Sequence, residues 1–503
     1  HADRLPGWPV YCRSEFGLVP NAAVCESDMP AQIMTTPAVG VIDPWSEDPD
    51  IRDYPSVVVS TTETCGEVPA STTRVYAIFH NGTEHPGGPF LPGWPAMPMI
   101  PLGDSIPIPM AVGSTMSPVV AVEECVTRIG VGSAAFFPQI IYYKGDEVGI
   151  RTTMPGLNIT SMANGAMASL NGDGDLALIV PMISALNVDD WGIHLLNFRI
   201  VANAMDEPYQ VISKHQIEDM PMWMSPVVAD LDNDGTSEII TGGGGYLVHA
   251  FNQACGEAPG WPKYTQKWVT AAPAVGDVDA DGLLEVVVPT QEGILYAWES
   301  AGIACRDGRP SSDWPRFQHD ERNSGFYGAD TVPPGRIVDL EARRESGDRV
   351  EIAFTAPGDD WACGRTAAYD VRYLTDRADL GDAGIFAGAE RIDGLPAPGD
   401  AGTMESIIVE APGALAIAVR AVDERGNLSR ISNTAEVTAS AGKGEGGTCG
   451  CSQLPGSTGA GSVNLGFLLL CVLYVFVFRV LLLRNPSVRI KSLNPLAEQK
   501  YDV

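Results

Sequence analysis

Positive charge and histidine are scarce in this sequence of 503 residues. It holds 32 Lys and Arg against 63 Asp and Glu, which gives a formal net charge of −31, and it contains seven His. A surface this acidic argues against a nucleic acid or an anionic membrane surface as the partner of the main body. The charge is uneven: residues 464–503 carry five Lys and Arg against two Asp and Glu, so +3 lies there and −34 on the rest.

Motifs of the common enzyme classes are also missing. The sequence has no G-x-S-x-G, no G-x-x-x-x-G-K-[ST] and no H-E-x-x-H, the marks of a nucleophile elbow, a P-loop and a zinc protease helix. Four glycines at 242–245 precede a predicted strand and not a helix, so they form no phosphate cradle. His80 and His85 lie near Glu84 in a predicted loop, and His249 lies in a predicted strand. The sequence therefore predicts no catalytic residue and no enzyme.

Metal-type C-x-x-C spacing is absent from residues 1–330, although six of the ten cysteines lie there. They are Cys12, Cys25, Cys65, Cys125, Cys255 and Cys305. An even number of scattered cysteines predicts structural disulfides and an oxidising compartment. Spacing does not decide the pairing: Cys12 with Cys25 and Cys255 with Cys305 are the short-range options, and Cys363 is left over.

Residues 275–288, VGDVDADGLLEVVV, place three aspartates at alternate positions before a glycine. In a tight loop the carboxylates of Asp277, Asp279 and Asp281 would crowd together, and like charges so close need a cation. Oxygen ligands alone suit a hard ion, and Ca²⁺ tolerates the irregular geometry of a loop better than Mg²⁺ does. Gly282 permits the turn, and Glu285 returns a last carboxylate where a strand begins, so the loop is not an EF-hand.

A second copy of this loop lies 47 residues upstream. Residues 225–251 align without gaps on residues 272–298, and the same positions recur as Asp230, Asp232, Asp234, Gly235 and Glu238. A period of about 40 to 50 residues, built from short β runs and turns, is typical of a propeller blade. Because an active site is normally built once per ring, two equivalent loops favour structural calcium over a glycosidase pair of carboxylates.

Three weaker copies extend the array upstream, at residues 165–181, 36–59 and 117–124. The first keeps Asp173 and Gly174 but has Ser169 and Ala177 where ligands belong. Metal binding is therefore expected to be weak or absent there. The other two copies keep only the residues that begin the unit and lack the aspartate loop.

These units resemble FG-GAP/VCBS repeats, the D-x-D-x-D-G-x-x-D/E calcium loops of integrin-type β-propellers. The resemblance covers residues 1–330 and implies an all-β ring of about five to seven four-stranded blades with Ca²⁺ in outer loops. It implies that the first, third, fifth and ninth side chains and the seventh carbonyl bind the ion, the carbonyls being those of Thr236 and Leu283. The segment 313–328, DWPRFQHDERNSGFYG, is expected to close the ring near the first residues.

Composition changes after Pro333, and a second module follows. Its segments alternate apolar and polar residues between Gly, Pro and Asp, which predicts half-buried strands of a sandwich of about 100 residues. Residues 331–440 resemble a fibronectin type III domain, with Trp361 ahead of the strand 369–373 and a closing segment VRAVDERGNLSRISN at 419–433. Such domains are mostly spacers or binding modules, and no chemistry is predicted in this one.

The end of the chain predicts a membrane anchor. A Gly/Ser-rich linker with Cys449 and Cys451 spans 441–463, and an apolar run of about 19 residues lies within a predicted transmembrane helix at 464–484. Basic residues follow it, which predicts a cytoplasmic tail at 485–503 and an extracellular body. This end also resembles the C-terminal sorting tails of myxobacterial surface proteins, which are cut near the cysteine. The predicted localisation is the cell surface, as a single-pass protein.

Two functions are compatible with these features. The first is a calcium-binding surface protein that acts in adhesion or in binding a protein or glycan ligand. The alternative is an extracellular enzyme that acts on polysaccharide, a lyase or glycosidase on a propeller scaffold. Its mark would be a non-repeated cluster of acidic and basic residues, and the irregular insertions at 60–116 and 182–224 are where a site or a binding face is expected. Ligand contacts and oligomeric state do not follow from the sequence.

Overall fold

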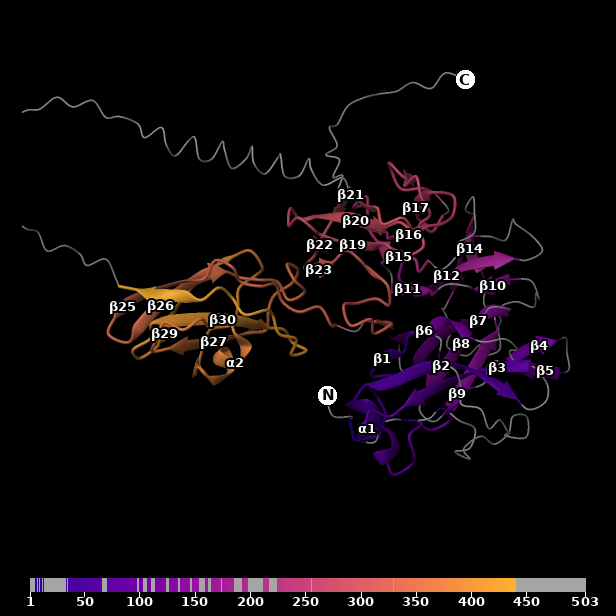
Figure 1. Ribbon diagram of the computed structural model, residues 1–503, viewed down its shortest axis with the longest axis horizontal. Coiled ribbons are helices and arrows are strands. Elements are labelled where there is room, and N and C mark those ends of the chain that lie inside the picture. The colour runs from indigo at the N-terminus through magenta and orange to yellow at the C-terminus, as the bar shows by residue number, and fades with distance from the viewer. Residues whose placement is uncertain are drawn as a thin grey trace, which may run out of the picture. The chain divides into compact units, whose positions relative to one another are not determined.

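The computed structural model shows an all-β chain, which confirms the predicted class (Figure 1). It describes residues 5–6, 8, 10, 12, 33, 35–65, 70–96, 99–102, 106–109, 114–123, 126–133, 136–144, 147–152, 159–161, 164–172, 174–184, 192–197, 211–216, 224–254, 256–328 and 330–439. Helix within these ranges is confined to α1 (Pro49–Arg52), the 3₁₀ turn η3 (Gly82–Glu84) and α2 (Ala383–Gly388). Both α-helices begin after an aspartate, Asp48 or Asp382, whose side chain accepts a backbone N–H that would otherwise lack a partner.

Five sheets account for most of residues 35–303. In pairing order they are β1 (Ala38–Gly40), β2 (Ser56–Cys65) and β3 (Ala70–Ile78); β24 (Phe326–Tyr327), β6 (Ser114–Glu123), β7 (Val126–Ser133), β8 (Phe136–Lys144) and β9 (Glu147–Thr152); β10 (Ile159–Ser161), β12 (Ala177–Ser184), β13 (Gly192–Asn197) and β14 (Val211–Gln216), with β11 (Ala166–Ala168) also on β12; β15 (Val227–Ala229), β16 (Glu238–Gly242), β17 (Leu247–Phe251) and β18 (Lys263–Tyr264); and β19 (Ala274–Gly276), β20 (Leu283–Pro289) and β21 (Leu295–Ile303). Two hairpins accompany them: β4 (Met99–Leu102) with β5 (Ile106–Pro109), and β22 (Cys305–Arg306) with β23 (Arg309–Pro310).

One segment, residues 311–327, forms hydrogen bonds to a strand in four of these sheets and to the residue after β11 in the fifth. Backbone N–H groups of β15 and β19 donate to its first half: Val228 to Trp314 (2.8 Å) and Val275 to Pro315 (2.8 Å). The sheet with β11 is reached through Ser169, whose N–H donates to the Asp313 carboxylate (3.0 Å). Its last residues accept from β1 and β6, through Val39 to Ser324 and Val120 to Gly325 (both 2.8 Å).

The sequence predicted that this segment lies near the first residues, and its final part does contact β1. Gly40 of β1 faces Phe326 so closely that an added Cβ would collide with the aromatic ring. The earlier part of the segment lies along β15 and β19 instead. The segment therefore links all five sheets and does more than join the two ends.

Buried side chains join neighbouring sheets in chain order. One cluster combines β1 to β3 with β6, β7 and β8 and includes Phe326. A second combines β6 and β8 with β11, β12, β15 and β16 around the fully buried Trp314. A third combines β15 to β17 with β20. Burial of this apolar surface stabilises each sheet through its neighbours, at about 25 cal/mol per Å² removed from water.

Residues 336–438 form a separate two-layered sandwich (Figure 1). Its strands, in pairing order, are β28 (Glu390–Ile392), β27 (Ala368–Leu374), β30 (Ala416–Val422), β31 (Ala435–Thr438), β25 (Glu341–Ser346), β26 (Arg349–Thr355) and β29 (Met404–Glu410). Phe354 of β26 meets Tyr369 of β27 edge to face, with 5.0 Å between ring centroids. Trp361, which the sequence placed ahead of a strand, is 54% exposed and lies outside the core.

The disulfide that the structure describes is not one of the two short-range options that the spacing left open. Cys305 of β22 is bonded to Cys363, 58 residues further on in the sandwich, and not to Cys255, which lies outside the described residues. Cys363 is therefore not left over. The bond ties the hairpin that follows the five sheets to the loop after β26, and spacing could not reveal it because the two cysteines meet only through the tertiary fold.

Carboxylates crowd together at one end of the sandwich. Burial raises the pKa of Asp359 to about 7, and the adjacent Glu424 adds to the rise. Burial also raises the pKa of Asp330 to about 6, with contributions from Asp360 and Asp423. The folded chain therefore holds protons that the unfolded chain has lost above about pH 4, so this end loses stability as the pH rises toward 7.

Replacing Asp359 by Asn is expected to raise the melting temperature at pH 8 by about 2 °C, because it removes an ionised group from a cluster of like charges. The gain should shrink toward pH 5, where the wild-type carboxyl is protonated. Asp400→Asn, at an exposed carboxylate elsewhere in the sandwich, is the matched control and should not change the melting temperature at either pH. A gain for Asp359→Asn that is equal at pH 5 and pH 8 would contradict the repulsion.

The prediction of a single-pass membrane protein is contradicted by the helices of the described residues. A membrane span needs about 20 consecutive apolar residues in helical form. Among the described residues no helix is long and apolar enough to cross a bilayer. The segment 464–484, on which the prediction rested, lies outside those residues, as do the linker 441–463 and the tail 485–503.

Candidate metal centres

The first aspartate loop connects β15 to β16. Hydrogen bonds from its backbone N–H groups to its own carboxylates hold the turn. Asp230 directly follows β15, and its carboxylate accepts the N–H groups of Asp234 (3.2 Å) and Gly235 (3.0 Å). The Asp232 carboxylate also accepts the Asp234 N–H (3.2 Å). Because these acceptors gather the backbone of the turn, the side chains of the alternate aspartates are held on one side of the loop.

The second loop, between β19 and β20, repeats the two bonds to its first aspartate 47 residues later. Asp277 accepts from the N–H groups of Asp281 and Gly282 (both 3.1 Å). The closing glutamates are held alike: Glu238 accepts from Leu231 N–H (2.8 Å), and Glu285 accepts from Val278 N–H (2.7 Å). The predicted repeat of the sequence is thus a repeat of hydrogen bonds.

Backbone angles in the two loops also agree. Asn233 and Ala280 have φ of 63° and 64°, and the glycines that follow two residues later, Gly235 and Gly282, have φ of 93° and 91°. Only glycine adopts the last of these values without steric cost, which explains the glycine at the sixth position of each motif. Thr236 and Leu283, the predicted carbonyl ligands, donate their N–H groups to Asp234 and Asp281 (both 2.8 Å).

The structure gathers three acidic side chains in each loop. Oxygen atoms of Asp230, Asp232 and Asp234 lie within 4.8 Å of one another in the first loop, and those of Asp277, Asp279 and Glu285 do so in the second. Glu238 and Asp281 stand outside these groups of three. Each loop therefore has a set of oxygen atoms that could hold a metal ion, and the predicted set of ligands is gathered in part.

Crowding of these carboxylates changes their proton affinity. Burial raises the pKa of Glu238 to about 7, and the neighbouring Asp232, Asp230 and Asp234 raise it further against the opposing hydrogen bond from Leu231. Burial likewise raises the pKa of Glu285. A bound cation would offset the repulsion and favour the ionised forms, so ion binding and proton loss are coupled in these loops.

An arginine distinguishes the first loop from the second. The guanidinium of Arg306 in β22 lies 2.9 Å from the Asp230 carboxylate and also donates to the Asn233 side chain. The side chain of Asp230 is only 7% exposed, so this charge lies at the inner side of the loop. Arg306 supplies part of the compensation that a cation would give, and the first loop is the better neutralised of the two.

The degraded loop at 165–181 keeps the turn without its first carboxylate. Gly172 and Gly174 have positive φ, as the equivalent residues of the intact loops do, and the Gly174 N–H donates to the Ser169 hydroxyl (3.0 Å). A neutral hydroxyl stands where Asp230 and Asp277 stand in the other loops. Asp173 lies outside the described residues, and the expectation of weak or absent metal binding stays a prediction.

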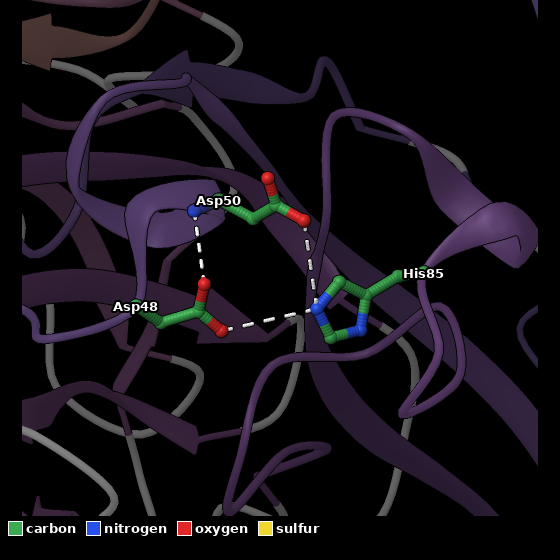
Figure 2. Close-up of side chains that lie close together, drawn as sticks. All are labelled: Asp48, Asp50 and His85. Atoms are coloured by element: carbon green, nitrogen blue, oxygen red, sulfur yellow. Dashed lines mark hydrogen bonds and ion pairs between the residues drawn. The ribbon is translucent and has the colours of Figure 1, made fainter.

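A third cluster, Asp48, Asp50 and His85, was missed by the sequence analysis. Its ligand-type atoms also lie within 4.8 Å of one another (Figure 2). The aspartates come from the connection between β1 and β2, and the histidine from the loop after β3. His85 falls in the insertion at 60–116 where a site was expected, but the sequence gave no reason to pair it with Asp48 or Asp50, 37 and 35 residues before it.

Comparison with known proteins identifies partial relatives. No family model matches the chain. Calcium-activated chloride channel regulator 1 of Homo sapiens is 31% identical over 178 residues, 30% of this chain and 19% of that protein. The protein of the same name in Equus caballus is 33% identical over 117 residues, 22% of this chain and 13% of that protein. The chain thus spans less than a fifth of the length of these relatives.

Two solved structures align with part of this chain at low similarity. A chain of the crystal structure of BBS1N in complex with ARL6DN, soaked with lead, aligns with 65% of this chain and 80% of its own length at 14% identity and a TM-score of 0.30. The α-L-arabinofuranosidase PaAbf62A of Podospora anserina, in complex with cellotriose, aligns with 54% of this chain and 90% of its own at 11% identity and a TM-score of 0.24.

Proposed function

We propose that this chain is a binding protein whose recognition surface is a calcium-ordered β-propeller of the FG-GAP/VCBS type, carried next to a fibronectin type III-like module. Residues 1–330 make up the propeller and residues 331–440 the module. The observation that carries the proposal is the pair of aspartate loops with the same hydrogen bonds and the same backbone angles at the same offset. Two loops built alike serve one structural purpose, and calcium is the cation that their all-oxygen donors suit.

Support for the propeller comes from residues 311–327. This segment forms hydrogen bonds to β1, β6, β15 and β19 and to Ser169 next to β11, so one stretch of chain lies beside all five sheets. Innermost strands that meet around a common centre, as in a propeller, would account for this. The number of sheets falls within the range of blades expected from the sequence. The sandwich, whose strands pair antiparallel except for β25 with β31, supports the fibronectin-like assignment of the second module.

A binding role is supported by several features together. The Cys305–Cys363 disulfide indicates a compartment outside the reducing cytosol. Similarity to proteins named calcium-activated chloride channel regulators points to action on another protein. Calcium would act by neutralising the carboxylates that the two loops crowd together, which fixes the loops and the surface beside them. The ligand we favour is a protein or glycan.

The test is the number of calcium ions and the loops that hold them. We expect isothermal titration of the chelator-treated chain to show two Ca²⁺ ions per chain, one lost in Asp232→Asn and the other in Asp279→Asn, with affinity in each case reduced by more than about tenfold. Asp400→Asn, at an exposed carboxylate of the sandwich, is the control and should leave both ions in place. Full calcium binding by the double variant Asp232→Asn, Asp279→Asn would overturn the assignment.

A further inference from the structure

We propose that Asp48, Asp50 and His85 form a binding site for a divalent transition metal ion of the Zn²⁺ type, distinct from the two aspartate loops. This inference does not depend on the proposed function. It starts from a set of donors of mixed chemistry, two carboxylates and an imidazole, whose atoms lie within 4.8 Å of one another. Figure 2 shows the three side chains converging from two different loops.

The distances within the cluster fit a shared ion better than direct hydrogen bonds. His85 Nε2 lies 3.8 Å from Asp48 Oδ2 and 3.7 Å from Asp50 Oδ2. A hydrogen bond between nitrogen and oxygen requires about 2.7 to 3.2 Å, so these contacts are too long. Two ligands that each bind Zn²⁺ at about 2.0 to 2.2 Å lie about 3 to 4 Å apart, which is the separation observed.

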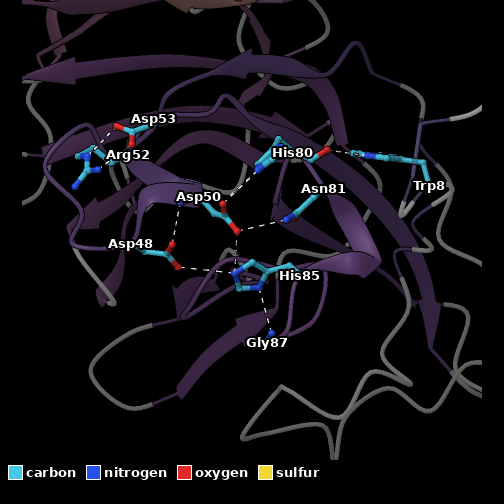
Figure 3. A network of polar contacts seen from close by, with 9 residues as sticks. All are labelled: Trp8, Asp48, Asp50, Arg52, Asp53, His80, Asn81, His85 and Gly87. Atoms are coloured by element: carbon cyan, nitrogen blue, oxygen red, sulfur yellow. Dashed lines mark hydrogen bonds and ion pairs between the residues drawn. The ribbon is translucent and has the colours of Figure 1, made fainter.

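A second histidine faces the same carboxylates. His80 Nε2 lies 3.5 Å from Asp50 Oδ1 (Figure 3). The side chain of His80 is 28% exposed, but its Nε2 atom is buried and has no hydrogen-bond partner. A buried ring nitrogen without such a partner is costly, and an unseen ion is one of the explanations for it. His80 is thereby placed to supply a further nitrogen ligand or to face a water bound to the ion.

The cluster is held in place by its surroundings. The ring of His85 stacks on Phe79, with 3.6 Å between ring centroids, and the ring of His80 stacks on Tyr54 at 4.1 Å. The Asp48 side chain caps α1 by accepting the Asp50 N–H (2.9 Å), and Asn81 donates to Asp50 Oδ2 (3.3 Å). Ligands fixed in this way lose little conformational entropy when an ion binds, which favours affinity.

The negative charges of Asp48 and Asp50 remain for a cation to neutralise. Arg52, the basic residue nearest to the two aspartates in the chain, is paired with Asp53 at 2.8 Å and points away from Asp48 and Asp50 (Figure 3). The side chains of Asp48 and Asp50 are 40% and 33% exposed, so an ion can reach them from solvent. Imidazole together with carboxylate favours first-row transition metals, whereas Ca²⁺ prefers oxygen donors alone.

The position of Asp48 and Asp50 in the fold also supports a metal site. The two aspartate loops connect the first to the second strand of their sheets, β15 to β16 and β19 to β20. Asp48 and Asp50 lie in the connection between β1 and β2, the same place in the first sheet. The connection between β1 and β2 has no D-x-D-x-D-G motif but carries these two carboxylates, and the loop after β3 supplies the nitrogens.

The experiment uses the whole chain in excess Ca²⁺, which keeps the aspartate loops filled, and titrates it with Zn²⁺ and, for its visible absorption, with Co²⁺. We expect one Zn²⁺ per chain and a Co²⁺ spectrum with nitrogen and oxygen donors. Asp48→Asn and His85→Gln should each weaken Zn²⁺ binding by more than about tenfold and abolish that spectrum. Glu84→Gln, at an exposed carboxylate next to His85 in the chain, is the matched control and should bind as the wild type does.

Two outcomes would overturn the site: no uptake of Zn²⁺ or Co²⁺ in the presence of Ca²⁺, or uptake that is unchanged in His85→Gln. Melting curves of each variant in Ca²⁺ separate loss of the site from loss of the fold, because a folded variant keeps the wild-type response to chelation. Asp232→Asn and Asp279→Asn should leave Zn²⁺ binding intact. Failure of the zinc site and failure of the calcium loops are therefore distinguishable.

Discussion

Removal of calcium is expected to lower the melting temperature of the chain by about 10 to 20 °C. An ion present at about 100 times its dissociation constant stabilises the folded state by about 2.7 kcal/mol per site, and the two loops are independent. For domains of this size about 1 kcal/mol corresponds to 2 to 4 °C. The physical reason is the repulsion among the carboxylates of Asp230, Asp232 and Asp234 and of their counterparts near Asp277. Differential scanning fluorimetry before and after EGTA measures the shift.

The control for this prediction is the double variant Asp232→Asn, Asp279→Asn. Because it has lost a carboxylate in each loop, its melting temperature should respond little to EGTA. Restoring Ca²⁺ to the treated wild type should recover the original melt, and Mg²⁺ should not, since it demands a more regular octahedral geometry. A wild-type melt that is the same with and without EGTA would show that the loops are acidic turns held by their own hydrogen bonds.

Loss of the Cys305–Cys363 disulfide is expected to destabilise the sandwich and its attachment to β22 by about 4 kcal/mol. The bond closes a loop between residues separated by 58 positions, and restricting a loop of that length in the unfolded chain accounts for a stabilisation of this size. The double variant Cys305→Ser, Cys363→Ser should therefore unfold at clearly lower urea concentration than the wild type, measured by intrinsic fluorescence.

A reductant provides the control for the disulfide. Wild-type chain treated with dithiothreitol should be no more stable than the double variant, because the reductant breaks this cross-link together with any other disulfide. The single variants should show the same loss as the double variant, since either one breaks the bond. Equal urea midpoints for wild type and double variant would mean that the packing around Cys363, which is only 6% exposed, holds the two segments without the bond.

The aspartate loops were predictable because their geometry is local. All carboxylates of a loop lie within nine positions of one another, and the glycine at the sixth position determines the turn. A motif of this kind needs little from the rest of the chain, and the structure shows the same hydrogen bonds in both copies. Arg306 was not predictable in the same way, because it reaches Asp230 from 76 positions further on.

Fibronectin-like features were predicted less fully. Period-two alternation correctly indicated the strands of the sandwich, since one face of each strand packs on the core and the other meets water. Trp361 does not belong to that core, being 54% exposed with a φ of 57°. An apolar side chain in a loop carries no periodicity, so its environment depends on the path of the backbone around it.

The sequence by itself determined the properties that depend on composition or on residues close together in the chain: the acidic surface, the all-β class, the 47-residue repeat and the two aspartate loops. Tertiary structure alone decided the pairing of Cys305 with Cys363, the path of residues 311–327 across five sheets, and the meeting of Asp48 and Asp50 with His85. Each of these joins residues tens to hundreds of positions apart. No local pattern specifies such a contact, because the burial of apolar surface between sheets brings the segments together and the side chains at their ends meet as a consequence.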